Sequence, residues 1–141
     1  MASQRVPCTP APAAPFAKAP LSAYVVLEVD GGLTGVLLRS SDPGSGRVRR
    51  RSLCAWCEDL LATEDVTLYV ARRGGAAGRA GNSIGTLICT DFTCSQNVRR
   101  RPTLTEAGAD AEDARRRVVE RRTAGLRERS TRFVQEVLST R

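Results

Sequence analysis

Four of the five cysteines in this 141-residue chain fall into two closely spaced pairs. Two residues separate Cys54 from Cys57, and four separate Cys89 from Cys94. Two such pairs can place four sulfur atoms at the corners of a tetrahedron, which is the arrangement that zinc takes in structural sites. Short spacing keeps both sulfurs of a pair on one tight turn, so only one longer loop must close. The sequence therefore predicts one structural zinc ion bound by these four cysteines.

Two other uses of the cysteines are open: disulfides or inert buried thiols, and a redox-active pair. A reactive Cys-x2-Cys is expected to open a helix within a βαβ unit, and the residues around Cys54 and Cys57 show no such pattern. The amino terminus lacks the basic start and apolar run of an export signal. Reduced, metal-binding cysteines are therefore favoured, and they indicate the cytoplasm.

The segments between and after the two pairs should form a hairpin and a helix. Residues 65–72 and Ser83–Cys89 each have the composition of a β-strand, and residues 92–101 have a helical pattern that Pro102 stops. A treble-clef zinc finger consists of a zinc knuckle, then a hairpin, then a helix whose first turn carries the last ligand. The knuckle here is the turn of Cys54 to Cys57. The single tryptophan, Trp56, is expected to pack over the metal site.

A second hairpin is predicted upstream of the first cysteine pair. Residues 24–29 and 33–38 are β-rich runs, and the short connection between them contains Asp30, Gly31 and Gly32. A connection that is short and rich in glycine allows positive φ angles and is typical of a hairpin.

The two ends of the chain differ in character from this middle part. Residues 1–20 are rich in proline and alanine, and we expect a disordered leader in which Cys8 is a free thiol. Residues 21–102 should form the treble-clef domain, and residues 103–141 a helical segment.

The helical segment carries a sparse apolar stripe among alternating arginine and glutamate residues, and a break or kink is expected near Gly125. The stripe favours packing against the sheet. The alternative is an arginine-rich helix that lies on RNA.

Charge and composition limit the classes of function. The net charge is +7 and all but one of the basic residues are arginine, which favours an acidic partner such as RNA or an acidic protein surface. The absence of histidine excludes an imidazole ligand, a histidine general base and a histidine-activated nucleophile. The carboxylates show no recognisable acid–base pairing, and no run reaches the roughly 18 apolar residues of a membrane span. We therefore expect neither an enzyme nor a membrane protein.

A basic, glycine-rich stretch, residues 72–83, lies between the two central strands. It lacks the Gly-Lys-Ser/Thr ending of a phosphate loop and joins two strands, so nucleotide binding is not expected. An adaptable hairpin tip suits recognition of a protein or RNA surface. Because the hairpin and the ligand-bearing helix share one metal, we expect a single binding surface. Its candidate residues are Arg72, Arg73, Arg79 and Asn82, with Arg99 and Arg100 beside them.

Residues 72–95 read RRGGAAGRAGNSIGTLICTDFTCS, and this stretch resembles the C-terminal treble-clef zinc finger of the FusB family. Cys54, Cys57 and the strand hairpin before them fit the same domain, so the similarity covers about residues 21 to 101. The resemblance implies zinc on the four cysteines and a surface that binds elongation factor G. Full-length members that protect this factor against fusidic acid carry a helical N-terminal domain, where this chain has the Pro/Ala leader.

Together these features predict a small α+β protein with one zinc ion and an antiparallel sheet. We expect a monomeric, cytoplasmic, non-enzymatic adaptor of the translation machinery that binds elongation factor G, on the ribosome or free of it. The alternative is a zinc finger that contacts ribosomal or transfer RNA through its arginines.

Overall fold

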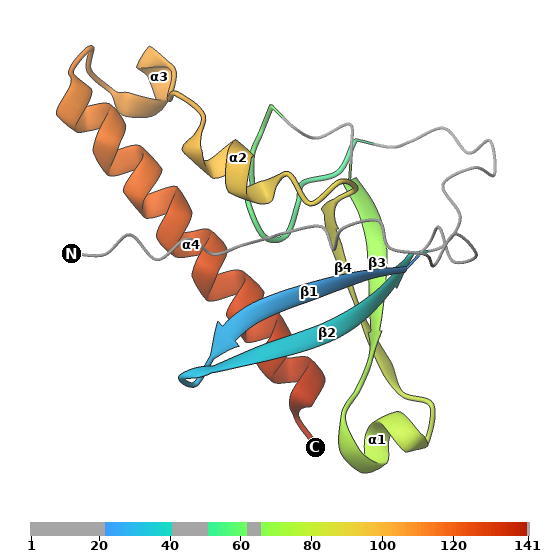
Figure 1. The fold of residues 1–141 in the computed structure, drawn as a ribbon. Helices are drawn as coiled ribbons and strands as arrows, with labels where there is room; N and C mark the ends of the chain where they lie inside the picture. The colour runs from blue at the N-terminus through green and yellow to red at the C-terminus, as the bar shows by residue number, and fades with distance from the viewer. Residues whose placement is uncertain (1–21, 41–50, 62–65, 141) are drawn as a thin grey trace, which may run out of the picture.

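The computed structural model describes residues 22–40, 51–61 and 66–140, so the predictions for the leader and for Cys8 lie outside the described residues. The described chain is α+β, with a four-stranded antiparallel sheet in the order β1-β2-β3-β4 (Figure 1). The elements in chain order are β1 (Ser22–Val29), β2 (Gly32–Ser40), β3 (Val66–Arg72), α1 (Gly75–Arg79), β4 (Ser83–Cys89), α2 (Cys94–Arg99), α3 (Leu104–Ala107) and α4 (Glu112–Leu138).

Two hairpins make up the sheet, and they share only a short stretch of pairing. β1 pairs along its whole length with β2 around a two-residue turn, in which Asp30 and Gly31 have φ angles of 50° and 81°. β3 and β4 also pair along their whole length. Between the hairpins, however, β2 pairs with β3 only from Leu38 to Ser40. The two hairpins therefore diverge from this stretch toward their tips (Figure 1).

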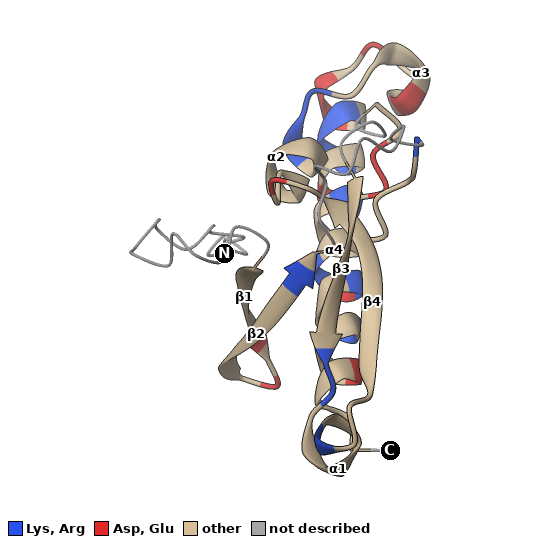
Figure 2. Cartoon of the chain, turned by 90° about the vertical axis from the view of Figure 1, so that its right-hand side faces the viewer, with Lys and Arg blue, Asp and Glu red and all other residues tan. Residues whose placement is uncertain are grey.

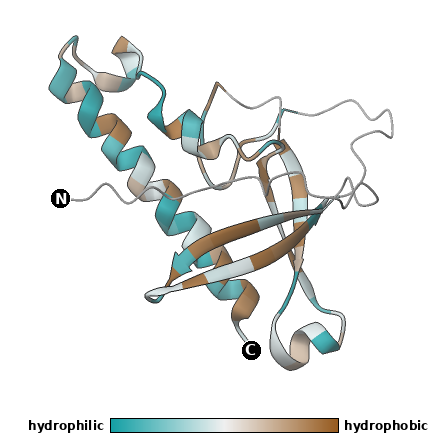
Figure 3. Ribbon diagram, in the orientation of Figure 1, coloured by the Kyte–Doolittle hydropathy of each residue, from teal (hydrophilic) through white to brown (hydrophobic). Residues whose placement is uncertain are grey.

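Alternation along the strands places one apolar face of the sheet against α4. Apolar residues are frequent along β1 and β2 and recur along α4 (Figure 3). The residues buried between these elements are Val25, Leu27, Val36 and Leu38 from the first hairpin, and Leu126, Phe133, Val134 and Val137 from α4. The expectation that the C-terminal helix packs against the sheet is confirmed.

Two local expectations were wrong. α4 runs through Gly125 without a break, because core residues of the same helix before and after it, Val118 and Leu126, are buried. The helical segment breaks instead at Gly108, which has a φ of 74° and caps α3. The glycine-rich tip is not an open loop, since it contains the short helix α1.

Trp56 is fully buried and joins the knuckle to α4. Its ring packs against Phe133, with 5.8 Å between the ring centroids. Its carbonyl oxygen accepts a hydrogen bond from Nε of Arg129, at 2.8 Å. The tryptophan that we expected over the metal thus fixes the position of the long helix.

None of the helices in residues 22–40, 51–61 and 66–140 combines the length and the apolar character that a membrane crossing requires.

Replacing Phe133 with alanine should lower the stability of the domain by about 3 to 4 kcal/mol, because it leaves a cavity beneath Trp56. Thermal unfolding followed by circular dichroism measures this change. Leu138→Ala is the matched control on the same helix, since that side chain is 45% exposed, and it should shift the melting temperature little. Equal shifts for the two variants would contradict the position of α4.

Candidate metal centre

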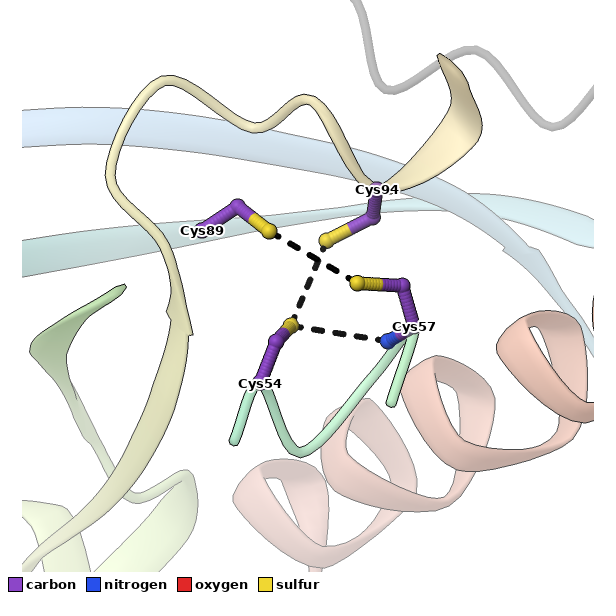
Figure 4. Close-up of side chains that lie close together, drawn as sticks. All are labelled: Cys54, Cys57, Cys89 and Cys94. Carbon is purple, nitrogen blue, oxygen red and sulfur yellow. Dashed lines mark hydrogen bonds between the residues drawn. The ribbon is translucent and has the colours of Figure 1, made fainter. Parts of the chain in front are cut away.

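The four paired cysteines meet at one point (Figure 4). Their sulfur atoms all lie within 4.8 Å of one another, with 3.6 Å from Cys54 to Cys94 and 3.6 Å from Cys57 to Cys89. A tetrahedron of sulfurs with Zn–S bonds of about 2.3 Å has edges of roughly 3.8 Å. All four cysteines are buried and none forms a disulfide. The donor atoms and their spacing therefore fit one zinc ion.

Both ligand turns contain a residue with a positive φ angle that is not glycine. Glu58 follows the knuckle with a φ of 52°, and its N–H donates to the Cys54 carbonyl oxygen at 3.0 Å. Phe92 lies between Cys89 and Cys94 with a φ of 55°, and its N–H donates to the Cys89 carbonyl oxygen at 3.1 Å. An aromatic side chain rarely adopts this conformation, and it persists only where the surroundings fix it.

The base of the β3–β4 hairpin fixes the ligand turns. The N–H of Ala55 in the knuckle donates to the carbonyl oxygen of Leu87 on β4, at 2.7 Å. The hydroxyl of Tyr69 on β3 donates to the carbonyl oxygen of Thr90 at 2.7 Å, and its ring centroid lies 5.0 Å from that of Phe92. The knuckle and the second pair are thereby positioned by the same strands.

Asn97 is a member of the site that the sequence analysis missed. Its Nδ2 lies 3.4 Å from the sulfur of Cys89 and 3.8 Å from that of Cys57, and it donates toward both. Such donors stabilise thiolate charge and orient the ligands. The available signal was position, because Asn97 lies one helical turn after Cys94 on α2.

Without a bound metal ion, four sulfurs this close cannot all carry a negative charge, so some of the thiols stay protonated. Hydrogen bonds with Cys57, Cys89 and Cys94 lower the pKa of Cys54. Hydrogen bonds with Cys54 and Cys57, and then burial, raise the pKa of Cys89 and the pKa of Cys94. Zinc requires thiolates, so its binding displaces these protons and weakens as the pH falls.

Four thiolates fill the coordination shell of a tetrahedral zinc ion, so the bound ion would link the knuckle to the start of α2 and leave no position for a water molecule.

A knuckle, a hairpin and a helix that begins at the last ligand define this protein as a treble-clef zinc finger. The sequence model of one family, the FBP C-terminal treble-clef zinc-finger, matches residues 17–137, and the chain therefore belongs to that family. The resemblance to the C-terminal finger of FusB-type proteins is confirmed. The matched range also includes nearly all of α4, so the long helix is part of the family's domain. Neither the curated proteins nor the solved structures include a match.

The six candidate partner-binding residues do not form the single surface that we expected. Basic residues gather around α1 at one end of the β3–β4 hairpin and around α2 at the other (Figure 2). A hairpin of seven paired residues per strand separates these ends by roughly 20 Å. The two groups share the metal-bound hairpin, but they lie at its opposite ends.

At the α1 end, the expected arginines help to build the tip itself. Nε of Arg72 donates to the carbonyl oxygen of Gly78 at 2.7 Å, and Arg73 forms a 3.4 Å ion pair with Glu136 of α4. The backbone N–H of Arg73 donates to the carbonyl oxygen of Asn82, at 3.0 Å. Arg79 is exposed. The tip is therefore anchored to α4, with Arg79 on its surface.

At the α2 end, the two candidate arginines differ. Arg100 bridges Asp59 at 2.9 Å and Glu106 at 2.7 Å, and Arg122 of α4 also pairs with Glu106. The side chain of Arg100 is 22% exposed and that of Asp59 only 5%. Arg99 is exposed and donates to the carbonyl oxygen of Ser95. Arg100 thus connects the knuckle, α2 and α3, whereas Arg99 lies at the surface.

This ion-pair cluster contributes to stability at neutral pH. Burial disfavours the charged form of Asp59, but hydrogen bonds from Arg100 and from the N–H of Leu61 outweigh it and lower the pKa of that carboxyl. The hydrogen bonds from Arg100 likewise lower the pKa of Glu106. Because folding lowers both pKa values, the stabilisation is present above about pH 4 and is lost as the pH falls.

The position of Asn97 predicts a role in metal affinity. Asn97→Leu should weaken zinc binding by roughly tenfold, because two sulfurs lose their N–H donor. Competition with a chromophoric chelator measures the affinity. Gln96→Leu, at an exposed position of the same helix, is the matched control and should bind zinc like the parent. Equal affinities for the two variants would remove Asn97 from the site.

Removal of Arg100 should destabilise the fold. Arg100→Ala leaves Asp59 buried without its partner, which costs about 3 kcal/mol. Arg99→Ala removes a neighbouring exposed arginine and should cost less than about 0.5 kcal/mol. Melting temperatures of the zinc-loaded proteins compare the two. A larger loss for Arg99→Ala would show that the ion-pair cluster does not hold the helices.

Proposed function

We propose that this domain binds elongation factor G as a non-enzymatic adaptor of the translation machinery in the cytoplasm. The observation that carries the proposal is family membership over residues 17–137, together with the complete set of four zinc ligands. The FusB family, which this finger resembles, includes members that bind the factor. The zinc-supported fold is the part of those proteins that this chain shares.

The chemistry of the centre supports binding as the activity. A zinc ion held by four cysteines has no open position at which to activate water. The buried carboxylate, Asp59, is engaged by Arg100, and Glu106 is engaged by Arg100 and Arg122. Neither carboxylate is therefore poised to act as a general base at neutral pH.

The surface charge suits an acidic partner. Arg79 and Arg99 are exposed at the two ends of the hairpin, and Arg117, Arg121 and Arg127 are exposed on α4. Exposed arginines can meet carboxylates in pairs of parallel hydrogen bonds. They can also meet phosphates, and Arg117 and Arg121 lie one turn apart on α4, so RNA remains the alternative partner.

Binding to elongation factor G and to a ribosomal RNA fragment, titrated side by side by calorimetry, tests the proposal. We expect the zinc-loaded protein to bind the factor with a shallow dependence on salt, because a protein interface buries an apolar centre. RNA binding would weaken log-linearly with salt, since each neutralised phosphate releases a counterion. Protein stripped of zinc should not bind. Tight RNA binding without affinity for the factor would overturn the proposal.

A further inference from the structure

The first hairpin leaves one edge of β2 open. β2 pairs with β3 only from Leu38 to Ser40, so the edge of residues 32–37 that faces β3 has no strand partner in the part of the chain that the structure describes. Val29 and Gly32 pair at the tight turn. Because hydrogen bonding to the partner strand alternates from residue to residue in an antiparallel pair, the N–H and C=O groups of Gly35 and Leu37 point away from β1. An open edge of this kind accepts an added strand.

The two hairpins diverge beside this open edge (Figure 1). Residues of both hairpins and of α4 line a groove there. Its volume is about 610 Å³, within the range of about 300 to 1,000 Å³ that is common for ligand sites. Gly35 and Leu37 line it from β2, Val70 lines it from β3, and Leu138 closes it from the end of α4. The groove therefore offers an apolar lining beside open backbone groups.

The outer face of the sheet beside the groove is also apolar. The register places Tyr24 opposite Leu37 and Leu68 opposite Leu87, and these four side chains are 52%, 36%, 44% and 41% exposed. Exposed apolar side chains that lie next to one another are typical of interaction surfaces. Both hairpins therefore present exposed apolar side chains on this face of the sheet, and Leu37 belongs to the face and to the groove.

The charges at the groove are of one sign. Arg39 and Arg72 line it, and none of its lining residues is acidic. Arg39 forms no ion pair with the described residues. Arg72 uses Nε for Gly78, and its two terminal nitrogens have no acceptor among the described residues. A partner that supplies carboxylates would pair with both guanidinium groups, whereas a second copy of this chain would supply the same basic groove.

We propose that the groove binds an extended, acidic segment of a protein partner, which adds as a strand to the open edge of β2. Backbone hydrogen bonds to Gly35 and Leu37 hold the segment, an apolar side chain contacts Leu37 and Val70, and carboxylates contact Arg39 and Arg72. This inference rests on the proposed function, because it places the segment in elongation factor G.

The substitution Gly35→Ile fills the groove and leaves the strand intact. A Cβ atom at Gly35 would have only Val26 Cγ2 near it, at 3.9 Å, and the backbone there is ordinary strand. A β-branched residue also favours this conformation. Gly32→Ile is the matched control on the same strand: its Cβ would meet only the Val29 carbonyl oxygen, at 3.9 Å, and Gly32 does not line the groove.

Calorimetric titration of zinc-loaded variants with elongation factor G tests the inference, together with amide hydrogen exchange of the parent protein in the complex. Gly35→Ile and Arg39→Glu should each weaken binding by roughly tenfold or more, while Gly32→Ile stays within about twofold. The amides of Gly35 and Leu37 should exchange more slowly in the complex. Hydrogen exchange is measured on the parent protein, so it tests the binding to β2 even if a variant fails to fold.

The outcomes separate this inference from the proposed function. If the parent protein binds the factor, but Gly35→Ile binds equally well and the β2 amides are not protected, the groove is wrong and the proposed function stands. If the parent protein does not bind the factor, both are wrong. A parent dimer that Gly35→Ile dissociates would show that a second copy occupies the groove, which also overturns the inference.

Discussion

The convergence of four buried sulfurs joins the knuckle, the end of β4 and the start of α2 at one point. The knuckle approaches the edge of β4 through one backbone hydrogen bond, and the second cysteine pair lies on a turn with an aromatic residue at positive φ. The chain has few aromatic residues with which to build a large core, at 4% of its length. A metal that links distant segments can compensate for a small core. The hairpin, the knuckle and α2 therefore depend on the same centre.

Two further links connect this centre to the long helix. Trp56 extends from the knuckle to Phe133, and Arg129 of α4 reaches the carbonyl oxygen of Trp56 and the carboxylate of Glu58. On the other side, Arg100 connects Asp59 of the knuckle loop to Glu106, which also pairs with Arg122 of α4. α4 is thus attached to both sides of the metal centre, in agreement with a family match that extends to residue 137.

The parts of the fold that could be predicted from sequence are those encoded locally. Cysteine spacing identified the ligands, and strand composition located β4 at its observed bounds. Contacts between distant residues were not visible: nothing near Arg100 in the sequence indicates a partner 41 residues away in Asp59. Gly125 was expected to break the helix because glycine costs about 1 kcal/mol there, but burial of Leu126 on the core side outweighs that cost. Its glycines led us to expect an adaptable tip. Gly78 of α1 instead packs against the backbone of Arg73, with no room for a Cβ atom.

The zinc K-edge X-ray absorption spectrum of the purified protein tests the central claim most directly. A centre built from Cys54, Cys57, Cys89 and Cys94 predicts a single shell of four sulfur atoms at about 2.3 Å, with no nitrogen or oxygen neighbour. A shell with fewer sulfurs and one or more lighter atoms, or protein that folds without zinc, would contradict the account.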